Sequence, residues 1–290
     1  MVGALIVSFN PNIATLKLNV KSIARQVDNL VIVDNGSKNI AEINKIVTNN
    51  VDLIKLESNK GIAFALNRGM EYLEKEGFLW VLTLDQDSIV PDNLIKSLTE
   101  QKEFYKSDTA ILSAKFVDDN QIDHIDNSTD TVIDSLTITA GSLTNISAWR
   151  TAGGFDEWLF IDTVDHDFNY RLLGLGYKVF KINSVEFRHS LGEAVNRPTL
   201  KKLLLIKKNA QAADHSTFRQ YYIYRNGVVL AKRYAKNPQY KILKLIATLR
   251  VLLLFKNPLS KMKAAFHGLK DGFKYSEKED HFFQVYKNKL

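Results

Sequence analysis

Apolar and polar positions form alternating blocks along the first 115 residues, and these blocks predict strands and helices in turn. Short apolar runs bounded by Asn, Asp, Gly or Ser are typical of buried strands, and apolar spacings of three and four are typical of helices. Strands joined by helical crossovers indicate an α/β fold with a mostly parallel sheet flanked by helices. The expected strands are 4–9, 29–35, 51–57, 78–84 and 110–116, and the expected helices are 10–26, 41–49, 62–76 and one beginning at Pro91.

The pattern is less regular after the fifth strand. Residues 130–145 predict one or two further strands, Val164–Leu173 predicts a helix, and Tyr177–Ile182 predicts another strand after a glycine turn. Beyond His189 the spacing is helical and is broken by prolines. These breaks are at Pro198, Pro238 and Pro258.

The charge also changes along the chain. Residues 1–195 hold 18 Lys and Arg against 27 Asp and Glu, a balance of −9, and residues 196–290 hold 21 against 5, a balance of +16. We therefore expect an α/β domain over 1–195 and a helical, basic C-terminal region over 196–290. Such a region suits an anionic membrane surface, or packs on the first domain with its lysines solvated. No nucleic-acid motif accompanies the charge, so we expect no nucleic-acid partner.

Composition narrows the functional classes. The chain has no cysteine, which excludes disulfides, thiolate nucleophiles and cysteine metal sites. The N-terminal run MVGALIVSFNP lacks the basic start of a signal peptide, and no stretch reaches the roughly 18 uncharged apolar residues of a membrane-spanning helix. We expect a cytoplasmic protein.

Three common catalytic motifs are missing from the sequence. The turn after the first strand, SFNPNI, has no glycine, so it cannot form the G-x-G-x-x-G turn of a nicotinamide-binding fold. No G-x-x-x-x-G-K-[ST] loop and no G-x-S-x-G elbow occurs. A site based on carboxylates remains.

Polar residues follow four of the predicted strands, where a parallel sheet places its ligand site. Turns favour such residues anyway, but four together at one sheet edge favour a site. Among them, Asp85 and Asp87 are separated only by Gln86, and like charges this close repel unless a cation compensates. They converge on one ligand if the chain turns there, as the nearby Pro91 favours. Their oxygens suit Mg²⁺ or Mn²⁺, which bridges protein carboxylates to substrate phosphates.

A second group of candidates lies at the start of the later helix. Asp162 and Asp165 are three residues apart and share a helix face, whereas Asp167 points away from Asp165. Acids at a helix start are favoured by the helix dipole, but the apolar run before Asp162 also suits a general base. His189 follows a strand, where a neutral imidazole could complete a metal shell.

The order and spacing of these segments resemble glycosyltransferase family 2, and within it bacterial rhamnosyltransferases that use dTDP-L-rhamnose. The resemblance covers roughly residues 3–195, and 219–234 resembles the same subgroup. It implies a GT-A fold, a divalent metal, Mg²⁺ or Mn²⁺, and inverting transfer of a sugar from a nucleoside diphosphate to an acceptor hydroxyl. The segments that carry it are ALIVSFNP, VIVDNGS, NKGIAFALNRGM, LDQDS, AGSLTN, GGFDEWLFIDTVDHDFNYRLLGLGYKV and HSLG.

The resemblance also implies roles for single residues. Asp165 aligns with the catalytic base, although Val164 replaces the Glu of the family's ED element, so Asp162 stays an alternative. Asp34 would contact the nucleotide base, Asp85 the ribose and Arg225 the diphosphate. The full implied set is Asn10, Asp34, Asn67, Asp85 and Arg225 for the nucleotide sugar, and Asp87 and His189 for the metal.

We therefore expect a metal-dependent rhamnosyltransferase of cell-surface polysaccharide biosynthesis, such as O-antigen, capsule or cell wall. The resemblance implies dTDP-rhamnose as donor and a saccharide acceptor of the polyprenyl-linked kind, reached from the inner face of the membrane. A UDP-sugar donor (hexose, hexosamine or galactofuranose) is an alternative. A nucleotidyltransferase would need a Gly- and Lys/Arg-rich loop that SFNPNI lacks. A non-catalytic membrane adaptor is disfavoured by the retained Asp85, Asp87 and Asp165.

Overall fold

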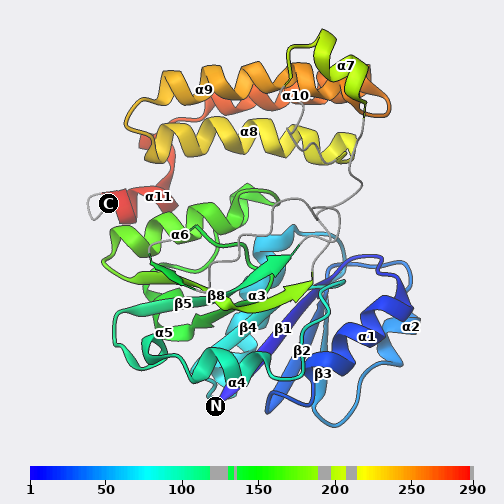
Figure 1. The fold of residues 1–290 in the computed structure, drawn as a ribbon, viewed down its shortest axis with the longest axis vertical. Coiled ribbons are helices and arrows are strands. Elements are labelled where there is room, and N and C mark those ends of the chain that lie inside the picture. Colours follow the sequence, from blue (N-terminus) through cyan, green and yellow to red (C-terminus); the bar gives the residue numbers. More distant parts are fainter. Residues whose placement is uncertain (118–129, 134–135, 189–196, 207–213, 288–290) are drawn as a thin grey trace. The chain divides into compact units, whose positions relative to one another are not determined.

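The chain divides into two compact units (Figure 1). A computed structural model describes residues 1–117, 130–133, 136–188, 197–206 and 214–287. The first unit, here the sheet unit, consists of Met1–Phe160 and Val164–Ser190. The second, here the helical unit, consists of Ile161–Thr163 and Leu191–Lys287. The separate roles predicted for 1–195 and 196–290 stay a prediction.

The sheet unit is built on one mixed sheet with the strand order β3-β2-β1-β4-β7-β5-β8-β6. Strands β1 to β4 are parallel as predicted, whereas β7 runs antiparallel to both β4 and β5. Strand β8 is parallel to β5, and β6 is antiparallel to β8. The bounds are β1 (Val2–Ser8), β2 (Asn29–Asp34), β3 (Val51–Lys55), β4 (Trp80–Asp85), β5 (Thr109–Val117), β6 (Thr131–Ile133), β7 (Ser142–Asn145) and β8 (Lys178–Arg188).

Helices cover both faces of the parallel half of the sheet. Alternate residues of a strand point to opposite faces. Ala4 and Ile6 of β1 pack in a cluster with α1 and α2, while Leu5 faces α3. Helix α3 lies so close that a Cβ at Gly69 would be 2.2 Å from Leu5 Cδ1. The helices of this unit are α1 (Ile13–Ile23), α2 (Ile40–Asn44), α3 (Ile62–Lys75), α4 (Leu94–Thr99), α5 (Ile146–Thr151) and α6 (Val164–Gly174), with 3-10 helices η1 (Lys102–Tyr105) and η2 (Glu157–Leu159).

Helix α6 is anchored by an ion pair within the protein interior. The side chains of Asp167 and Arg171 are both 0 % exposed and pair at 2.9 Å, and Arg171 also donates to the carbonyl of Ala152. Buried charges are stable only when paired and hydrogen-bonded. Asp167 therefore points into the interior and fixes the first turns of α6.

The helical unit has its own apolar core, in which residues of α8, α9 and α10 meet. Pro198, Pro238 and Pro258, predicted as helix breaks, are each the first residue of a helix, where their missing N–H costs nothing. The elements are α7 (Pro198–Leu203), α8 (Thr217–Tyr234), α9 (Pro238–Ala247), η3 (Thr248–Leu254), α10 (Pro258–Lys274), η4 (Glu277–Glu279) and α11 (His281–Lys287).

Helices α8 and α10 pack backbone against backbone. A Cβ at Gly268 would lie 2.2 Å from the carbonyl oxygen of Tyr221, and one at Gly272 would lie 2.7 Å from that of Arg225. Two glycines four residues apart thus allow the close approach. The Lys232 amine donates to three carbonyls at the end of α10, at 2.8–3.2 Å, and burial lowers its pKa.

Within the described ranges, no helix combines the length and the apolar composition needed to cross a bilayer.

We predict that Gly268→Ala lowers the free energy of unfolding by about 1–3 kcal/mol, because the added methyl overpacks the contact with the α8 backbone. Urea denaturation followed by circular dichroism measures this. The control, Ser260→Ala on an exposed position of α10, should stay within about 0.5 kcal/mol of the wild type. Coincident curves for Gly268→Ala and the wild type would contradict the close packing.

Candidate active site

Strands β1, β2 and β4 end at the same edge of the sheet and bring two of the candidate carboxylates there. Ser8 of β1 is in register with Asp34 of β2, and Val7 is in register with Asp85 of β4. Asp34 and Asp85 therefore flank the end of β1, roughly 10 Å apart by two strand spacings. The structure collects these polar groups where a parallel sheet binds ligands.

The chain turns immediately after Asp85. The Ser88 N–H donates to the Asp85 carbonyl at 3.2 Å, which closes a tight turn around Gln86 and Asp87. The Gln86 side chain accepts from the N–H of Phe9 at 2.8 Å, so the turn is tied to the end of β1. Asp85 is half-buried and Asp87 is exposed. The turn favours convergence of the two carboxylates on one ligand.

Asp34 organises the neighbouring loops. Its carboxylate, in a residue only 1 % exposed, accepts from the Ser8 hydroxyl at 3.2 Å and from the Ser37 N–H at 2.9 Å. Asn10, with φ at 47°, donates its N–H to the Ser37 hydroxyl at 2.7 Å and accepts from the Lys38 N–H at 2.8 Å. The loops after β1 and β2 are thus one hydrogen-bonded rim.

Asn67 of α3 is engaged inside the protein. Its amide nitrogen donates to the Phe155 carbonyl and to Glu157 Oε1, both at 2.9 Å. Its oxygen accepts from the Phe155 N–H at 2.8 Å and from Trp149 Nε1 at 3.3 Å. These bonds use both donors and both acceptor positions of the amide. The nucleotide contact predicted for Asn67 stays a prediction, and it would require one of these bonds to break.

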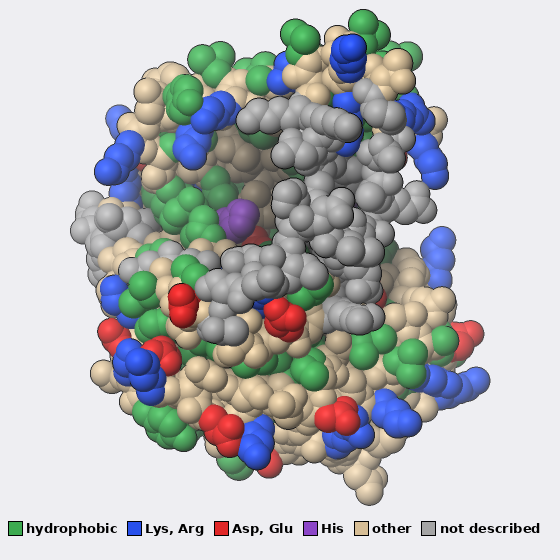
Figure 2. Space-filling model, viewed as in Figure 1, with side chains coloured by type: hydrophobic (Ala, Val, Ile, Leu, Met, Phe, Trp, Pro, Cys, Tyr) green, Lys and Arg blue, Asp and Glu red, His purple; other side chains and the backbone are tan. Residues whose placement is uncertain are grey.

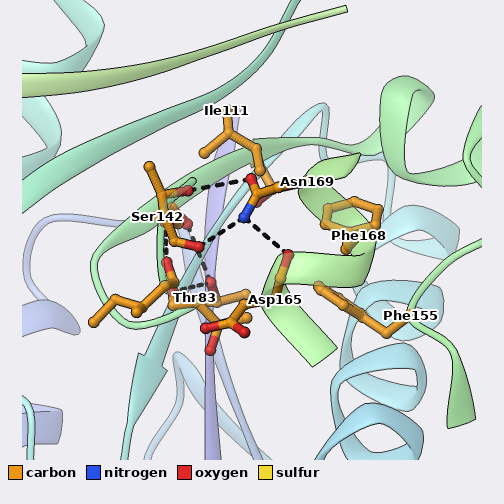
Figure 3. Close-up of a pocket in the computed structure, with 11 residues that line it drawn as sticks. Thr83, Ile111, Ser142, Phe155, Asp165, Phe168 and Asn169 are labelled. Atoms are coloured by element: carbon orange, nitrogen blue, oxygen red, sulfur yellow. Dashed lines mark hydrogen bonds between the residues drawn. The ribbon is translucent and has the colours of Figure 1, made fainter. Parts of the chain in front are cut away.

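A small pocket lies beside Asp165 at the start of α6 (Figure 3). Residues from β4, β5, β7 and α6 line it, with Phe155 and Phe168 providing an apolar wall. The lining includes Thr83, Ile111, Ser142, Phe155, Asp165 and Phe168. The carboxylate thus borders both polar and apolar groups, the setting in which a carboxylate serves as a general base.

Hydrogen bonds hold Asp165 and its helix turn in place. Asp165 Oδ1 accepts from the His166 N–H at 2.8 Å. The Asn169 amide donates to the Asp165 carbonyl at 2.8 Å and to the Thr137 carbonyl at 2.7 Å. Asn169 therefore connects the first turn of α6 to the segment before β7.

Asp162, the alternative base, has a different environment. In the helical unit, both its oxygens accept from the Arg219 guanidinium, at 2.5 and 3.3 Å. Both oxygens are therefore engaged by the guanidinium and are less accessible to a substrate hydroxyl. The geometry therefore favours Asp165 over Asp162.

Two other predicted residues have less structural support. His189 lies outside the described residues. In the helical unit, Arg225 is 8 % exposed, its Nε donates to Asn226 at 2.8 Å, and its guanidinium lies 4.6 Å from the centre of the Tyr222 ring. The roles predicted for His189 and Arg225 stay predictions.

A divalent metal fits the donors at the strand ends. In the described part of the chain, no three His, Asp or Glu side chains form a metal site. Mg²⁺ is commonly bound by one or two carboxylates together with substrate phosphates, and Asp85 and Asp87 supply that number of oxygen ligands.

The sequence did not predict the hydrogen bonds that join the loop after β2 to the loop after β3. Asn35 donates to Asn59 at 3.1 Å and accepts from the Lys60 N–H at 2.8 Å. Gly61 follows with φ at 92°, and a Cβ there would lie 2.6 Å from the Phe160 carbonyl oxygen. The only signal in the sequence was Asn and Gly at strand and helix ends.

Comparison with known sequences gives two matches. Residues 4–140 match the family model described as Glycosyl transferase family 2. Over 93 % of its length, the chain is 26 % identical to the dTDP-rhamnosyl transferase RfbF of Shigella flexneri, and the match covers 95 % of that protein.

Solved structures share the fold. A crystal structure of GalNAc-T7 with UDP, GalNAc and Mn²⁺ superposes with a TM-score of 0.60 at 14 % identity, covering 97 % of this chain and 58 % of GalNAc-T7. The chain thus spans little more than half of that protein. A crystal structure of S. aureus TarS 1–349 in complex with UDP-GlcNAc superposes with a TM-score of 0.58 at 14 % identity, covering 99 % of this chain and 87 % of TarS 1–349. The predicted GT-A fold is confirmed.

Proposed function

This chain is a glycosyltransferase, and its residues 4–140 match the family 2 model. We propose that it transfers L-rhamnose from dTDP-L-rhamnose to a saccharide acceptor, with inversion at the anomeric carbon. The observation that carries the proposal is the pair Asp85 and Asp87 in a turn at the sheet edge, beside Asp34. The likeness to a dTDP-rhamnosyl transferase supports the donor, and polysaccharide biosynthesis is the proposed setting.

Binding of the donor would use the strand-end residues. Asp34 and Asn10 would contact the nucleoside, Asp85 the ribose, and Arg225 the diphosphate. Asp87, with Asp85 and His189 as further candidates, would hold Mg²⁺ or Mn²⁺. A bound divalent cation neutralises the charge that develops on the diphosphate as the glycosidic bond breaks.

Asp165 would act as the general base. Its carboxylate accepts the proton of the acceptor hydroxyl while that oxygen attacks the anomeric carbon on the face opposite the diphosphate. The half-buried position of Asp165 beside the pocket and its anchoring through Asn169 support this role. Asp162 is less suited because it pairs with Arg219.

A UDP-sugar donor is a second candidate. It is favoured by the similar solved structures, which contain UDP with GalNAc and Mn²⁺, or UDP-GlcNAc. Both candidates share the same carboxylates and differ only in the nucleotide and sugar.

The helical unit would rest on the anionic inner face of the membrane, where a polyprenyl-linked acceptor would lie. Leu259, Phe266 and Phe273 of α10 are 80, 52 and 51 % exposed, and their spacing of seven puts them on one helix face. Lys263 and Lys270 are exposed beside them. Figure 2 shows Lys and Arg side chains on the C-terminal helices as well as on the sheet unit. Apolar groups flanked by lysines are typical of helices at an anionic interface.

Isothermal calorimetry with Mn²⁺ should give dTDP binding at least roughly tenfold tighter than UDP or GDP, a difference of about 1.4 kcal/mol. Removal of the metal, or Asp87→Ala, should weaken dTDP binding, because the carboxylate helps to hold the cation. Asp92→Ala, at another exposed carboxylate, is the matched control and should bind as the wild type does. Tighter UDP binding would favour the second donor, and metal-independent binding would refute the role of Asp87.

Asp165→Asn should lower kcat by roughly 10²–10⁴-fold, the usual contribution of a general base, with nucleotide affinity unchanged. Asp162→Asn should lower kcat by about tenfold or less, because Asp162 helps to position the start of α6 and does not accept the proton. Steady-state transfer assays with dTDP-rhamnose compare the variants. Retained transfer in Asp165→Asn would remove the assignment.

Replacement of Leu259, Phe266 and Phe273 by Gln should weaken binding to vesicles containing phosphatidylglycerol by roughly 100-fold, given the transfer energy of the lost apolar groups. Co-sedimentation measures it, and binding of the wild type should fall with salt and with neutral lipid.

The matched control replaces Leu18 and Leu79, exposed apolar residues of the sheet unit, by Gln. Equal vesicle binding by the α10 variant and this control would show that α10 is not the membrane surface.

A further inference from the structure

The segment Ile161–Thr163 joins Phe160 to the start of helix α6, and helix α8 holds its backbone. The side-chain nitrogen of Asn226 donates to the carbonyl of Ile161 at 2.8 Å and to that of Asp162 at 2.9 Å. Asn226 is 0 % exposed. Its oxygen accepts from Arg225 Nε, which can only donate, so the orientation of the amide is determined.

A second side chain of α8 holds the same segment. Arg219 pairs with both oxygens of Asp162, whose side chain is 11 % exposed. Arg219 and Asn226 are seven residues apart, so they lie on one face of α8, two turns from each other. One face of α8 therefore binds both the backbone of Ile161–Thr163 and the carboxylate of Asp162.

The held conformation is one that the segment would not adopt by itself. Phe160, Asp162 and Thr163 have φ values of 66°, 63° and 62°. Residues other than glycine rarely take positive φ, and such conformations persist only where the surroundings impose them. Three within four positions require external restraint, and the bonds from α8 provide it for the last two.

We propose that Asn226 and Arg219 are positioning residues for the transfer reaction. They hold Asp162 and Thr163 at positive φ, and this sets where α6 begins and where Asp165, two residues after Thr163, presents its carboxylate. The inference rests on the role of Asp165 in the proposed function. Neither residue contacts the reacting atoms in this role.

The test uses the full chain with Asn226→Ala and Arg219→Ala. Displacing a catalytic group by about 1 Å costs on the order of 10² in rate, so kcat should fall by about 10- to 100-fold. In Arg219→Ala the KM for the nucleotide sugar should change by less than about twofold, because the Arg219 guanidinium binds Asp162 and has no proposed role in donor binding. The KM test is not applied to Asn226→Ala, because Asn226 also accepts from Arg225, the proposed diphosphate ligand. Hydrogen exchange should accelerate at the amides of 161–166, which is a readout independent of activity.

Tyr224→Phe is the matched control. It removes a hydrogen bond of the same helix, from the Tyr224 hydroxyl to Thr248 at 2.9 Å, that does not involve Ile161–Thr163. It should leave kcat and the exchange of 161–166 unchanged. Arg219→Lys keeps the charge and should recover part of the rate lost in Arg219→Ala.

Several outcomes would overturn the inference. They are wild-type kcat in both alanine variants, unchanged exchange at 161–166, or a loss of rate that only matches the loss of folded protein. If Asn226→Ala does not fold, Arg219→Ala alone tests the inference. The Arg219 side chain is 40 % exposed, so its removal should leave the chain folded. Transfer retained in Asp165→Asn would instead refute the role of Asp165 in the proposed function. An inactive Asp165→Asn with fully active Asn226→Ala would refute the inference alone.

Discussion

The parallel pairing of β1 with strands on both sides is the constraint on which the site depends. Because Ser8 is opposite Asp34 and Val7 is opposite Asp85, the loops that follow these three strands emerge next to each other. A shift of one residue in this register would move each strand's inward side chains to the opposite face. Burial of β1 on both faces, between α1 and α3, makes such a shift costly and so fixes the carboxylates in place.

The sequence predicted what local pattern determines. Strands β1 to β5, the helices between them and the turn at Asp85–Ser88 follow from apolar runs and turn residues, and all are found. The antiparallel direction of β7 was not predicted, because it depends on which strand edge is open once β4 and β5 have formed. The pairing of Asp162 with Arg219, 57 positions away, was also not predicted, because no local pattern indicates it. This pairing bears directly on whether Asp162 or Asp165 is the general base.

Asn67 shows how a motif residue can serve a structural purpose. A sequence match cannot distinguish an amide that binds a ligand from one that binds the protein, since both need the same side chain at the same place. Here the amide joins α3 to the turn at Phe155, and Phe155 in turn lines the pocket beside Asp165. Support for the site thus comes from residues that need not contact a substrate.

The strand order also has a consequence for synthesis on the ribosome. Strands β3, β2, β1 and β4 all lie within the first 85 residues, whereas β7, the other neighbour of β4, begins at Ser142. While the intervening residues are being added, β4 is an edge strand whose apolar residues and unpaired backbone groups are open to other chains. The half-formed sheet therefore exposes an edge through which chains can aggregate, until β7 pairs with β4.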